Sequence, residues 1–263
     1  MFFGKSPAPQ SCKKNKKRID NRRKKCYNEI GSFLKGRFFM TEQKIREQIC
    51  EVGHNLWALG FVAANDGNIS VKLDDGTFLA TPTGTSKRIL TPEMLIKMNE
   101  MNEVIDCPEG FRPSSEFKMH LRCYKERPEI RAVVHAHPPT ATGFAIAHIP
   151  LDDYTMPEAI IFLGSVPIAP YGTPGSQEVP DSVAPFLRDH DTILLMNHGA
   201  LTVGVDLTQA YYRMETLEHF AKVSLVARQL GGAKELERGK IEECCEIAKA
   251  FPIRHPGYKK YSL

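Results

Sequence analysis

The sequence of 263 residues lacks the features of a membrane-spanning or secreted protein. It has no run of about 18 consecutive apolar residues, the length that a membrane-spanning helix needs. Its first residues contain no apolar core of about 7–15 residues, so a secretory signal is not predicted. The seven cysteines are odd in number and form no Cys-x-x-Cys pair, which argues against a disulfide framework or a thiolate zinc site. We expect reduced thiols, a cytoplasmic location and no membrane partner.

Nucleotide-binding motifs and repeats are also absent. No segment matches a Walker loop or a dinucleotide fingerprint, so nucleotide chemistry is not indicated. No internal repeat and no low-complexity linker follows Met40. With 42% hydrophobic and 25% charged residues, the composition is that of an ordinary globular domain.

The charge is unevenly distributed. The net charge of +4 by itself suggests an anionic partner such as nucleic acid. Residues 1–39, however, hold 12 of the 35 Lys and Arg and only 2 of the 31 Asp and Glu, a net of +10, and the remainder carries −6. The chain is therefore an acidic domain behind a basic leader, and we expect no nucleic-acid partner for the domain.

Three interpretations of the leader are open. It could be a tail that binds nucleic acid through counterion release, or an Arg-rich transit peptide, although Asp20, Glu29 and the few serines fit the latter poorly. We favour a third interpretation, in which residues 1–39 are disordered or translation begins at Met40. Residues 35–37, Lys-Gly-Arg, can be encoded by a purine-rich ribosome-binding sequence just ahead of that methionine.

Helices alternate with short strands after Met40. Thr41 can cap a helix whose apolar residues recur at steps of three and four up to Gly60. Further helices are predicted at 115–126, 139–147, 176–189 and 207–230, with one more starting at Thr91, and strands at 68–73, 77–81, 131–136, 166–169, 192–196 and 200–203. This alternation favours one α/β domain over residues 40–263, with a central sheet.

Three histidines form a candidate metal site. His135 and His137 lie two apart in a predicted strand, so both rings leave the same face, about 6.6 Å apart at the backbone. His198 follows another apolar strand. Three histidines without cysteine suit a catalytic zinc ion, because three protein ligands leave a coordination position for substrate. The alternative is that each is a hydrogen-bonded core histidine.

Three segments could bind an anion. Ser114-Ser115-Glu116 begins a predicted helix, where unpaired amides and serine hydroxyls favour a phosphate, although a plain N-cap is the alternative. Residues 66–68 and 81–87 combine glycines with hydroxyl and amide groups that can surround an anion. Each of these two segments alone would be an ordinary turn.

Together, these segments resemble the class II aldolase/adducin family, and within it the L-fuculose-1-phosphate aldolases. The resemblance covers nearly all of residues 41–230 and leaves the leader without a counterpart. It rests on the order and spacing of six motifs: Gly67-Asn68-Ile69-Ser70, Thr81-Pro82-Thr83-Gly84, Pro113-Ser114-Ser115-Glu116, His135-Ala136-His137-Pro138, Ala169-Pro170-Tyr171-Gly172 and Asn197-His198-Gly199.

The resemblance implies a fold and a set of roles. It implies a three-layer α/β/α domain with a mixed, largely antiparallel sheet, one Zn²⁺ per subunit held by His135, His137 and His198, and Glu116 as acid/base, able to approach the metal in the resting state. Family members are usually homotetramers with the active site at a subunit boundary. The residues that match the phosphate-binding loops are Gly67, Asn68, Thr83, Gly84, Ser114 and Ser115.

The implied reaction is cleavage of a deoxyketose 1-phosphate, such as L-fuculose 1-phosphate, into dihydroxyacetone phosphate and an aldehyde. Zinc stabilises the enediolate as a Lewis acid and Glu116 moves the proton. Glutamate favours an aldolase over the ribulose-phosphate 4-epimerases, which carry Asp at this position. Aldolases of 5-deoxyribulose or methylthioribulose 1-phosphate, and a methylthioribulose-1-phosphate dehydratase, remain alternatives. The intact histidine set argues against a non-enzymatic, adducin-like structural module.

One position departs from the family pattern. Where fuculose-phosphate aldolases use a tyrosine to protonate the aldehyde-side oxygen, this sequence has Met156, which cannot donate a proton. Tyr154 or Glu158 could replace it, as could Tyr258 or Tyr261 near the C-terminus. The sequence therefore leaves the aldehyde half of the substrate open.

Overall fold

The computed structural model describes residues 40–251; the basic leader, Tyr258 and Tyr261 lie outside the described residues. The strands are β1 (Asn68–Lys72), β2 (Phe78–Ala80), β3 (Ile96–Met98), β4 (Val104–Asp106), β5 (Ala132–Ala136), β6 (Ile168–Ala169), β7 (Thr192–Leu195) and β8 (Gly199–Gly204). The α-helices are α2 (Glu42–Ala58), α3 (Phe117–Glu126), α4 (Pro139–Ile146), α5 (Pro157–Phe162), α6 (Glu178–Leu187), α7 (Leu207–Gln229) and α8 (Arg238–Ala248).

The eight strands form one sheet in the order β4-β3-β2-β1-β5-β8-β7-β6. Every neighbouring pair is antiparallel except β6 and β7, which are parallel. The expected mixed, largely antiparallel sheet is thus confirmed. Strands β1 and β5 lie at its centre, with Asn68 directly opposite His135.

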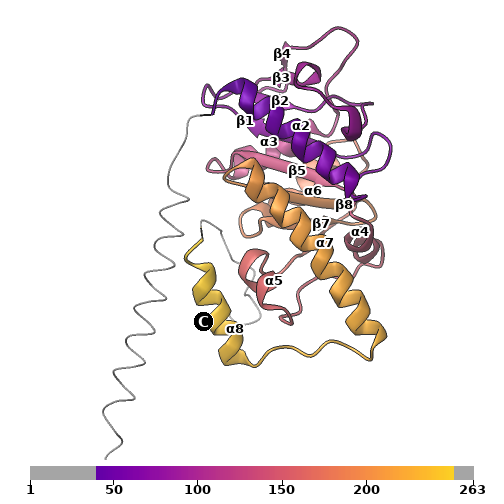
Figure 1. Ribbon diagram of the computed structural model, residues 1–263, viewed down its shortest axis with the longest axis vertical. Helices are drawn as coiled ribbons and strands as arrows, with labels where there is room; N and C mark the ends of the chain where they lie inside the picture. The colour runs from indigo at the N-terminus through magenta and orange to yellow at the C-terminus, as the bar shows by residue number, and fades with distance from the viewer. Residues whose placement is uncertain (1–39, 252–263) are drawn as a thin grey trace, which may run out of the picture. The chain divides into compact units, whose positions relative to one another are not determined.

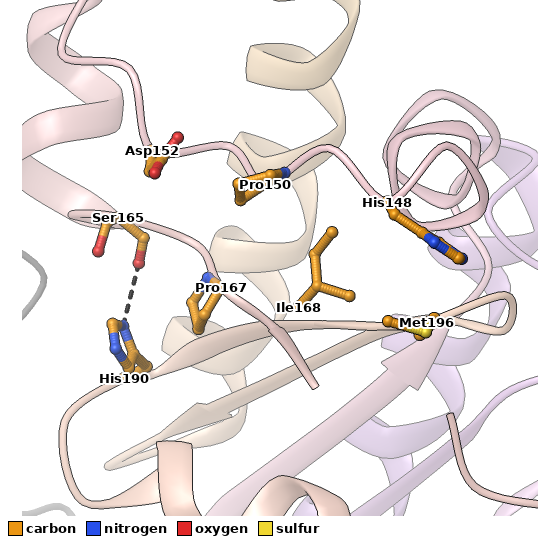
Figure 2. Close-up of a pocket in the computed structure, with 8 residues that line it drawn as sticks. All are labelled: His148, Pro150, Asp152, Ser165, Pro167, Ile168, His190 and Met196. Carbon is orange, nitrogen blue, oxygen red and sulfur yellow. Dashed lines mark hydrogen bonds between the residues drawn. The ribbon is translucent and has the colours of Figure 1, made fainter. Parts of the chain in front are cut away.

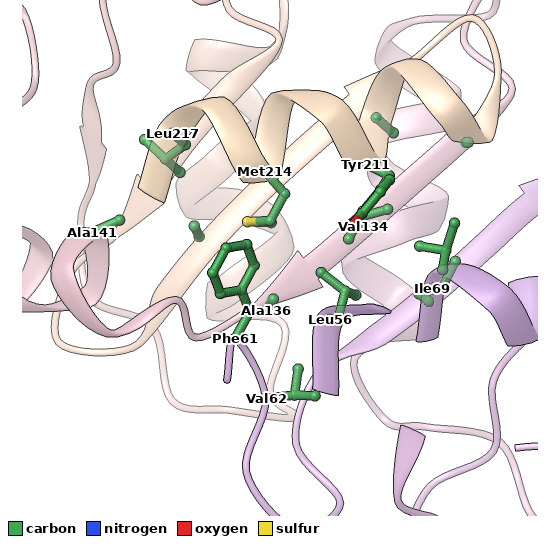
Figure 3. Packing of buried hydrophobic residues seen from close by; sticks show 14 of the residues in the cluster. Leu56, Phe61, Val62, Ile69, Val134, Ala136, Ala141, Tyr211, Met214 and Leu217 are labelled. Carbon is green, nitrogen blue, oxygen red and sulfur yellow. The ribbon is translucent and has the colours of Figure 1, made fainter. Parts of the chain in front are cut away.

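Helices cover both faces of the sheet. Side chains on one face, such as Ile69, Val134 and Ala136, pack under α2, α4 and α7 (Figures 1 and 3). Side chains on the other face, such as Val133 and Leu201, pack under α3 and α6. Because successive strand residues alternate between faces, each strand contributes to both layers. The three-layer α/β/α arrangement expected from the resemblance is confirmed.

Local sequence signals account for the first elements of the domain. The Thr41 hydroxyl accepts a hydrogen bond from the Lys44 amide at 3.3 Å and caps α2 as predicted. Between β1 and β2, the Asp75 carboxylate accepts from the Thr77 amide at 2.9 Å, and Gly76 has a φ of +85°, a conformation that suits glycine. The predicted helix-to-hairpin order is therefore observed.

The structure differs from the sequence prediction between Thr91 and Asp106 and at two helices. The helix expected from Thr91 is only a single 3-10 turn, η2 (Pro92–Met94), because the chain enters β3, where Ile96 and Met98 are buried against β2. Strands β3 and β4 and helices α5 and α8 were not predicted. They have 3 to 11 residues, too few for most of them to display a clear periodicity.

No helix within residues 40–251 has both the length and the apolar character needed to cross a membrane.

A buried carboxylate connects α7 to the segment that follows the paired histidines. Glu218, 1% exposed, accepts hydrogen bonds from the amides of Thr140 (3.0 and 3.1 Å) and Ala141 (2.9 Å) in the first turn of α4. These amides have no partner within the helix, and the positive end of the helix dipole favours the negative charge. Helix α4 begins two residues after His137, so this contact anchors the end of the histidine segment.

We expect Glu218→Gln to lower the free energy of unfolding by about 1–2 kcal/mol, because the charge and one of the two acceptors for these amides are lost. Urea denaturation measures the change. Lys222→Ala is the control, since Lys222 lies 3.5 Å from the same carboxylate but is 59% exposed; it should change stability by less than about 0.5 kcal/mol. Equal effects of the two substitutions would contradict the capping role.

Candidate metal centre and active site

Three histidines from two parts of the sheet meet at one point. His135 lies in β5, His137 follows it, and His198 lies in the turn between β7 and β8. One ring nitrogen from each lies within 4.8 Å of the others. The ring centroids are 4.8–5.1 Å apart. The structure thus brings together the three histidines that the sequence singled out, and the group could hold a metal ion.

Hydrogen bonds orient two of the rings. The Nδ1 of His135 lies 2.9 Å from the carbonyl oxygen of Ala200 and therefore donates to it, which leaves Nε2 as a free acceptor. The Nδ1 of His137 lies 3.4 Å from an Asp66 carboxylate oxygen. Hydrogen-bond acceptors of this kind, which contact the ring but not the metal, set the tautomer of metal-binding histidines.

The spacing of the ring nitrogens fits a tetrahedral ion. The Nε2 atoms of His135 and His137 are 3.2 Å apart. Two nitrogens bound tetrahedrally at 2.0–2.1 Å would be about 3.3 Å apart. When both Nδ1 atoms carry the proton, the facing lone pairs repel one another unless a cation lies between them. The donor set therefore fits a zinc-like divalent ion.

Burial keeps two of the rings neutral. Removal from water lowers the pKa of His135 well below its usual range, and the neighbouring His198 and His137 lower it further. Burial also lowers the pKa of His198, against the opposing effect of Glu116. Since imidazole binds metal only when it is neutral, both shifts favour metal binding.

Glu116 lies against the histidine group. Its carboxylate oxygens are 3.6 Å from Nε2 of His135 and 3.4 Å from Nε2 of His198. The amide of Asn68 donates to the first of these oxygens at 2.6 Å, and the other oxygen is buried without a hydrogen-bond partner in the described chain. A carboxylate with one oxygen held and one uncommitted can approach a metal or a substrate proton.

The three candidate phosphate segments converge near Glu116. The hydrogen bond from Asn68 to Glu116 joins segment 66–68 to segment 114–116. Segment 81–87 lies beside the start of segment 114–116, because the Thr83 amide donates to the Arg112 carbonyl at 3.0 Å. The Ser114 hydroxyl accepts from the Glu116 amide at 3.3 Å. Of the other expected residues, Gly67 is half-buried, and Gly84 and Ser115 are exposed.

Two glycines permit these close contacts. A Cβ at Gly199 would lie 2.5 Å from the ring of His137 and 2.6 Å from the Ala136 carbonyl oxygen. A Cβ at Gly67, where φ is +70°, would lie 2.8 Å from the His135 carbonyl oxygen. Neither space admits a side chain, so both glycines are required by the approach of the histidine strand.

The proposed aldehyde-side residues lie in another part of the fold. Tyr154 is 2% exposed and belongs to a hydrophobic cluster with Ile160 and with Ile241 of α8. Glu158 is exposed on the first turn of α5, where its charge acts on Cys244 of α8. The structure therefore places both residues beside α8 rather than within the histidine group, and their role stays a prediction.

A buried polar chain behind the site was not singled out from the sequence. His120 of α3 is 1% exposed, and its Nδ1 lies 2.7 Å from the Ser70 hydroxyl, which lies 2.8 Å from the hydroxyl of Tyr124. Burial lowers the pKa of His120 to about 3. The available signal was Ser70, a polar residue on the strand face that also carries Asn68.

A pocket of about 410 Å³ lies along β6 at the edge of the sheet, from His190 before β7 to Met196 after it (Figure 2). Its polar groups include His148, whose Nε2 lies 2.7 Å from the Asn197 side-chain oxygen, and His190, whose Nδ1 donates to the Ser165 carbonyl at 3.1 Å. The pocket is lined by His148, Pro150, Asp152, Ser165, Pro167, Ile168, His190 and Met196.

This fold and histidine group coincide with a known family. The sequence profile described as "Class II Aldolase and Adducin N-terminal domain" matches residues 47–225. That range includes all three histidines, Glu116 and the three phosphate segments. The chain belongs to the class II aldolase/adducin family.

Curated relatives have two kinds of named activity. A 3-oxo-tetronate 4-phosphate decarboxylase of Escherichia coli (strain K12) is 32% identical over 194 residues, which cover 72% of this chain and 90% of the relative. An L-fuculose phosphate aldolase of Methanococcus vannielii is 33% identical over 178 residues, covering 68% and 94%. The crystal structure of YgbL from Escherichia coli has a TM-score of 0.72 at 30% identity, covering 77% and 98%. These relatives support an enzyme of the lyase type.

We expect the purified protein to bind one divalent ion per chain. His198→Gln removes one ligand and should weaken zinc binding by more than about 100-fold. Loss of a residue that only hydrogen-bonds to a ligand usually costs 10- to about 100-fold. Titration with a zinc chelator, with metal content measured by mass spectrometry, tests this. The control is His54→Gln, an exposed histidine of α2; an equal loss in that variant would exclude the proposed ligand set.

We expect His120 to make the fold acid-sensitive. Its folded-state pKa is about 3 and the unfolded value is about 6.5, so between these pH values the unfolded chain binds more protons and stability falls as the pH drops. The contribution is about 1.4 kcal/mol per pH unit. His120→Asn should therefore flatten the dependence of unfolding free energy on pH between 6 and 4. The exposed His219 supplies the control, His219→Asn, which should leave the slope unchanged.

Proposed function

We propose that this protein is a zinc-dependent aldolase that cleaves a deoxyketose 1-phosphate, such as L-fuculose 1-phosphate, into dihydroxyacetone phosphate and an aldehyde. The observation that carries the proposal is the position of Glu116, 3.4–3.6 Å from two of three converging histidine nitrogens and beside the candidate phosphate segments. The aldolase names of curated relatives add support.

The histidine group would hold the metal and Glu116 would move the proton. When bound, zinc supplies Lewis-acid stabilisation for the negative charge that carbon–carbon cleavage leaves on the substrate. Asn68 holds one oxygen of Glu116, and the other, which lies 3.4 Å from His198, would carry the proton. In cleavage, the C4 hydroxyl gives its proton to solvent and C4 becomes the aldehyde carbon as the C3–C4 bond breaks. The electron pair of that bond passes to the C2–C3 enediolate, and protonated Glu116 then delivers a proton to C3. In condensation, Glu116 removes that proton.

The candidate phosphate segments would hold the substrate at its other end. Small polar loops and a helix start favour anions, so the phosphate would be bound by amides and hydroxyls of Gly67, Asn68, Thr83, Gly84, Ser114 and Ser115. This arrangement would direct the ketose carbonyl toward the histidines. By analogy with family members, the active unit would be a homotetramer.

A second candidate reaction is decarboxylation of a 3-oxo acid phosphate. Met156, at the position of the family's proton-donating tyrosine, favours it, because carbon dioxide leaves without a proton on its oxygen. Loss of carbon dioxide from 3-oxo-tetronate 4-phosphate yields dihydroxyacetone phosphate through the same enediolate. The phosphate, the ketone and Glu116 would thus have the same roles in both reactions. Curated relatives carry this activity in their names.

One assay separates these reactions. Fuculose, ribulose, 5-deoxyribulose and methylthioribulose 1-phosphates and 3-oxo-tetronate 4-phosphate are incubated with the zinc-loaded protein. Dihydroxyacetone phosphate is measured in each case, together with aldehyde and carbon dioxide. Aldehyde indicates the aldolase and carbon dioxide the decarboxylase. Loss of water without dihydroxyacetone phosphate would select the dehydratase and refute both.

Glu116→Gln should lower turnover by roughly 10²–10⁴, the range for general acid–base catalysis, with zinc content retained. The matched control is Glu126→Gln at the other end of α3, where the carboxylate pairs with Arg122 at 2.7 Å. Steady-state kinetics and metal analysis of both variants test the role. Near-normal turnover in Glu116→Gln would place the proton transfer on another group.

A further inference from the structure

Lys87 is a buried lysine at the end of the candidate phosphate segment 81–87. It begins the single-turn helix η1 (Lys87–Ile89), and the residue is 1% exposed. Its ammonium donates to the carbonyl oxygens of Thr85 at 3.1 Å and Asn65 at 3.4 Å. Thr85 directly follows Gly84, and Asn65 precedes Gly67 by two residues. The lysine therefore connects segment 81–87 to the residues just before segment 66–68.

The ammonium of Lys87 has no close counter-ion within residues 40–251. Among these residues, no carboxylate oxygen lies within 4.0 Å of Nζ. The acids whose charges act on it are Asp66 and Glu116, and their carboxylates lie against the histidines instead. A buried charge without a partner is costly, so its presence calls for an anion that completes the site.

Lys87 stays largely charged at neutral pH. Burial lowers the pKa of its ammonium to about 8, and the charges of Asp66 and Glu116 oppose that shift. The ammonium has three donors, and the two carbonyls use two of them. One N–H remains for a ligand.

The neighbouring cation has a different environment. Arg88 is exposed, and its guanidinium stacks over the ring of Trp57 at 4.7 Å. Of two consecutive basic residues, only Lys87 is buried beside the segments around Glu116.

We propose that Lys87 provides the positive charge of the phosphate subsite and determines the preference for a phosphorylated over an unphosphorylated ketose. This inference rests on the proposed function, since it assigns one residue to the phosphate end of that substrate. The two backbone carbonyls hold the ammonium in place, and the substrate phosphate supplies the missing counter-charge. A residue that only joined the two segments would need donors but no charge.

Substitution at Lys87 separates charge from structure. Lys87→Gln keeps amide donors and removes the charge, Lys87→Met removes both, and Arg88→Gln is the matched control for charge one residue away. Inorganic phosphate is titrated calorimetrically into each zinc-loaded protein. We expect about 10- to 100-fold weaker phosphate binding in both Lys87 variants, the effect of losing a buried charge partner, and less than twofold change in Arg88→Gln.

Kinetics with two aldol donors supply a second readout. The ratio of kcat/KM for dihydroxyacetone phosphate to that for dihydroxyacetone should fall by the same factor in Lys87→Gln, whatever change the two reactions share. A merely structural loss would lower both equally and overturn the inference. If Lys87→Met fails to fold, as judged by circular dichroism, phosphate binding by Lys87→Gln alone tests the role of the charge.

The outcomes distinguish the two proposals. A wild-type protein that cleaves a sugar phosphate while Lys87→Gln binds phosphate within threefold of wild type overturns the role of Lys87 alone. A wild-type protein that binds phosphate through Lys87 but cleaves no ketose phosphate or 3-oxo acid phosphate overturns the proposed reaction and leaves an anion site. Absence of phosphate binding in the wild type overturns the role of Lys87, and the cleavage assay then decides on the proposed reaction by itself.

Discussion

The pairing of β1 with β5 determines how Asn68, Glu116 and His135 meet. Its register sets Asn68 opposite His135, on the face covered by α3. Asn68 can then hold Glu116 at the start of that helix, and Gly67 can pass close to the histidine strand. A slip of one residue would turn the imidazole of His135 into the hydrophobic layer under α2 and α7. The hydrophobic alternation that stabilises the sheet therefore also orients the metal ligands.

The site combines neutral ligands with charges placed around them. Burial keeps His135 and His198 uncharged, while the carboxylates of Asp66 and Glu116 lie at hydrogen-bond or near-contact distance from the rings. Such an arrangement could hold a divalent cation, and a bound cation would provide a positive centre for the substrate proposed above. Lys87 lies on the side of the phosphate segments, so the positive charge extends from the metal position toward them. Under the proposed function, an acidic domain would in this way recognise a phosphorylated sugar without a basic surface.

The sequence predicted most of this site because its signals are local. The spacing of His135 and His137, the helix start at Glu116 and the strand end before His198 each show in a few consecutive residues. Strands β3 and β4 could not be predicted from the sequence, because three-residue strands carry little periodicity. Their conformation depends on pairing, of β3 with β2 and of β4 with β3. The burial of Lys87 was equally hidden, since lysine is ordinarily exposed and only the folded loops remove it from water.

Gly199 links the sheet to the metal centre in a way that bears on other members of the family. Its hydrogen occupies the only space between the Ala136 carbonyl and the ring of His137, so alanine there would displace the ring or the strand. Position 199 is thus a marker that can be scored in any related sequence. A relative that carries a side chain at this place would lack the close packing of strand and ring that is present here, and its histidine rings would have to lie farther from the strand.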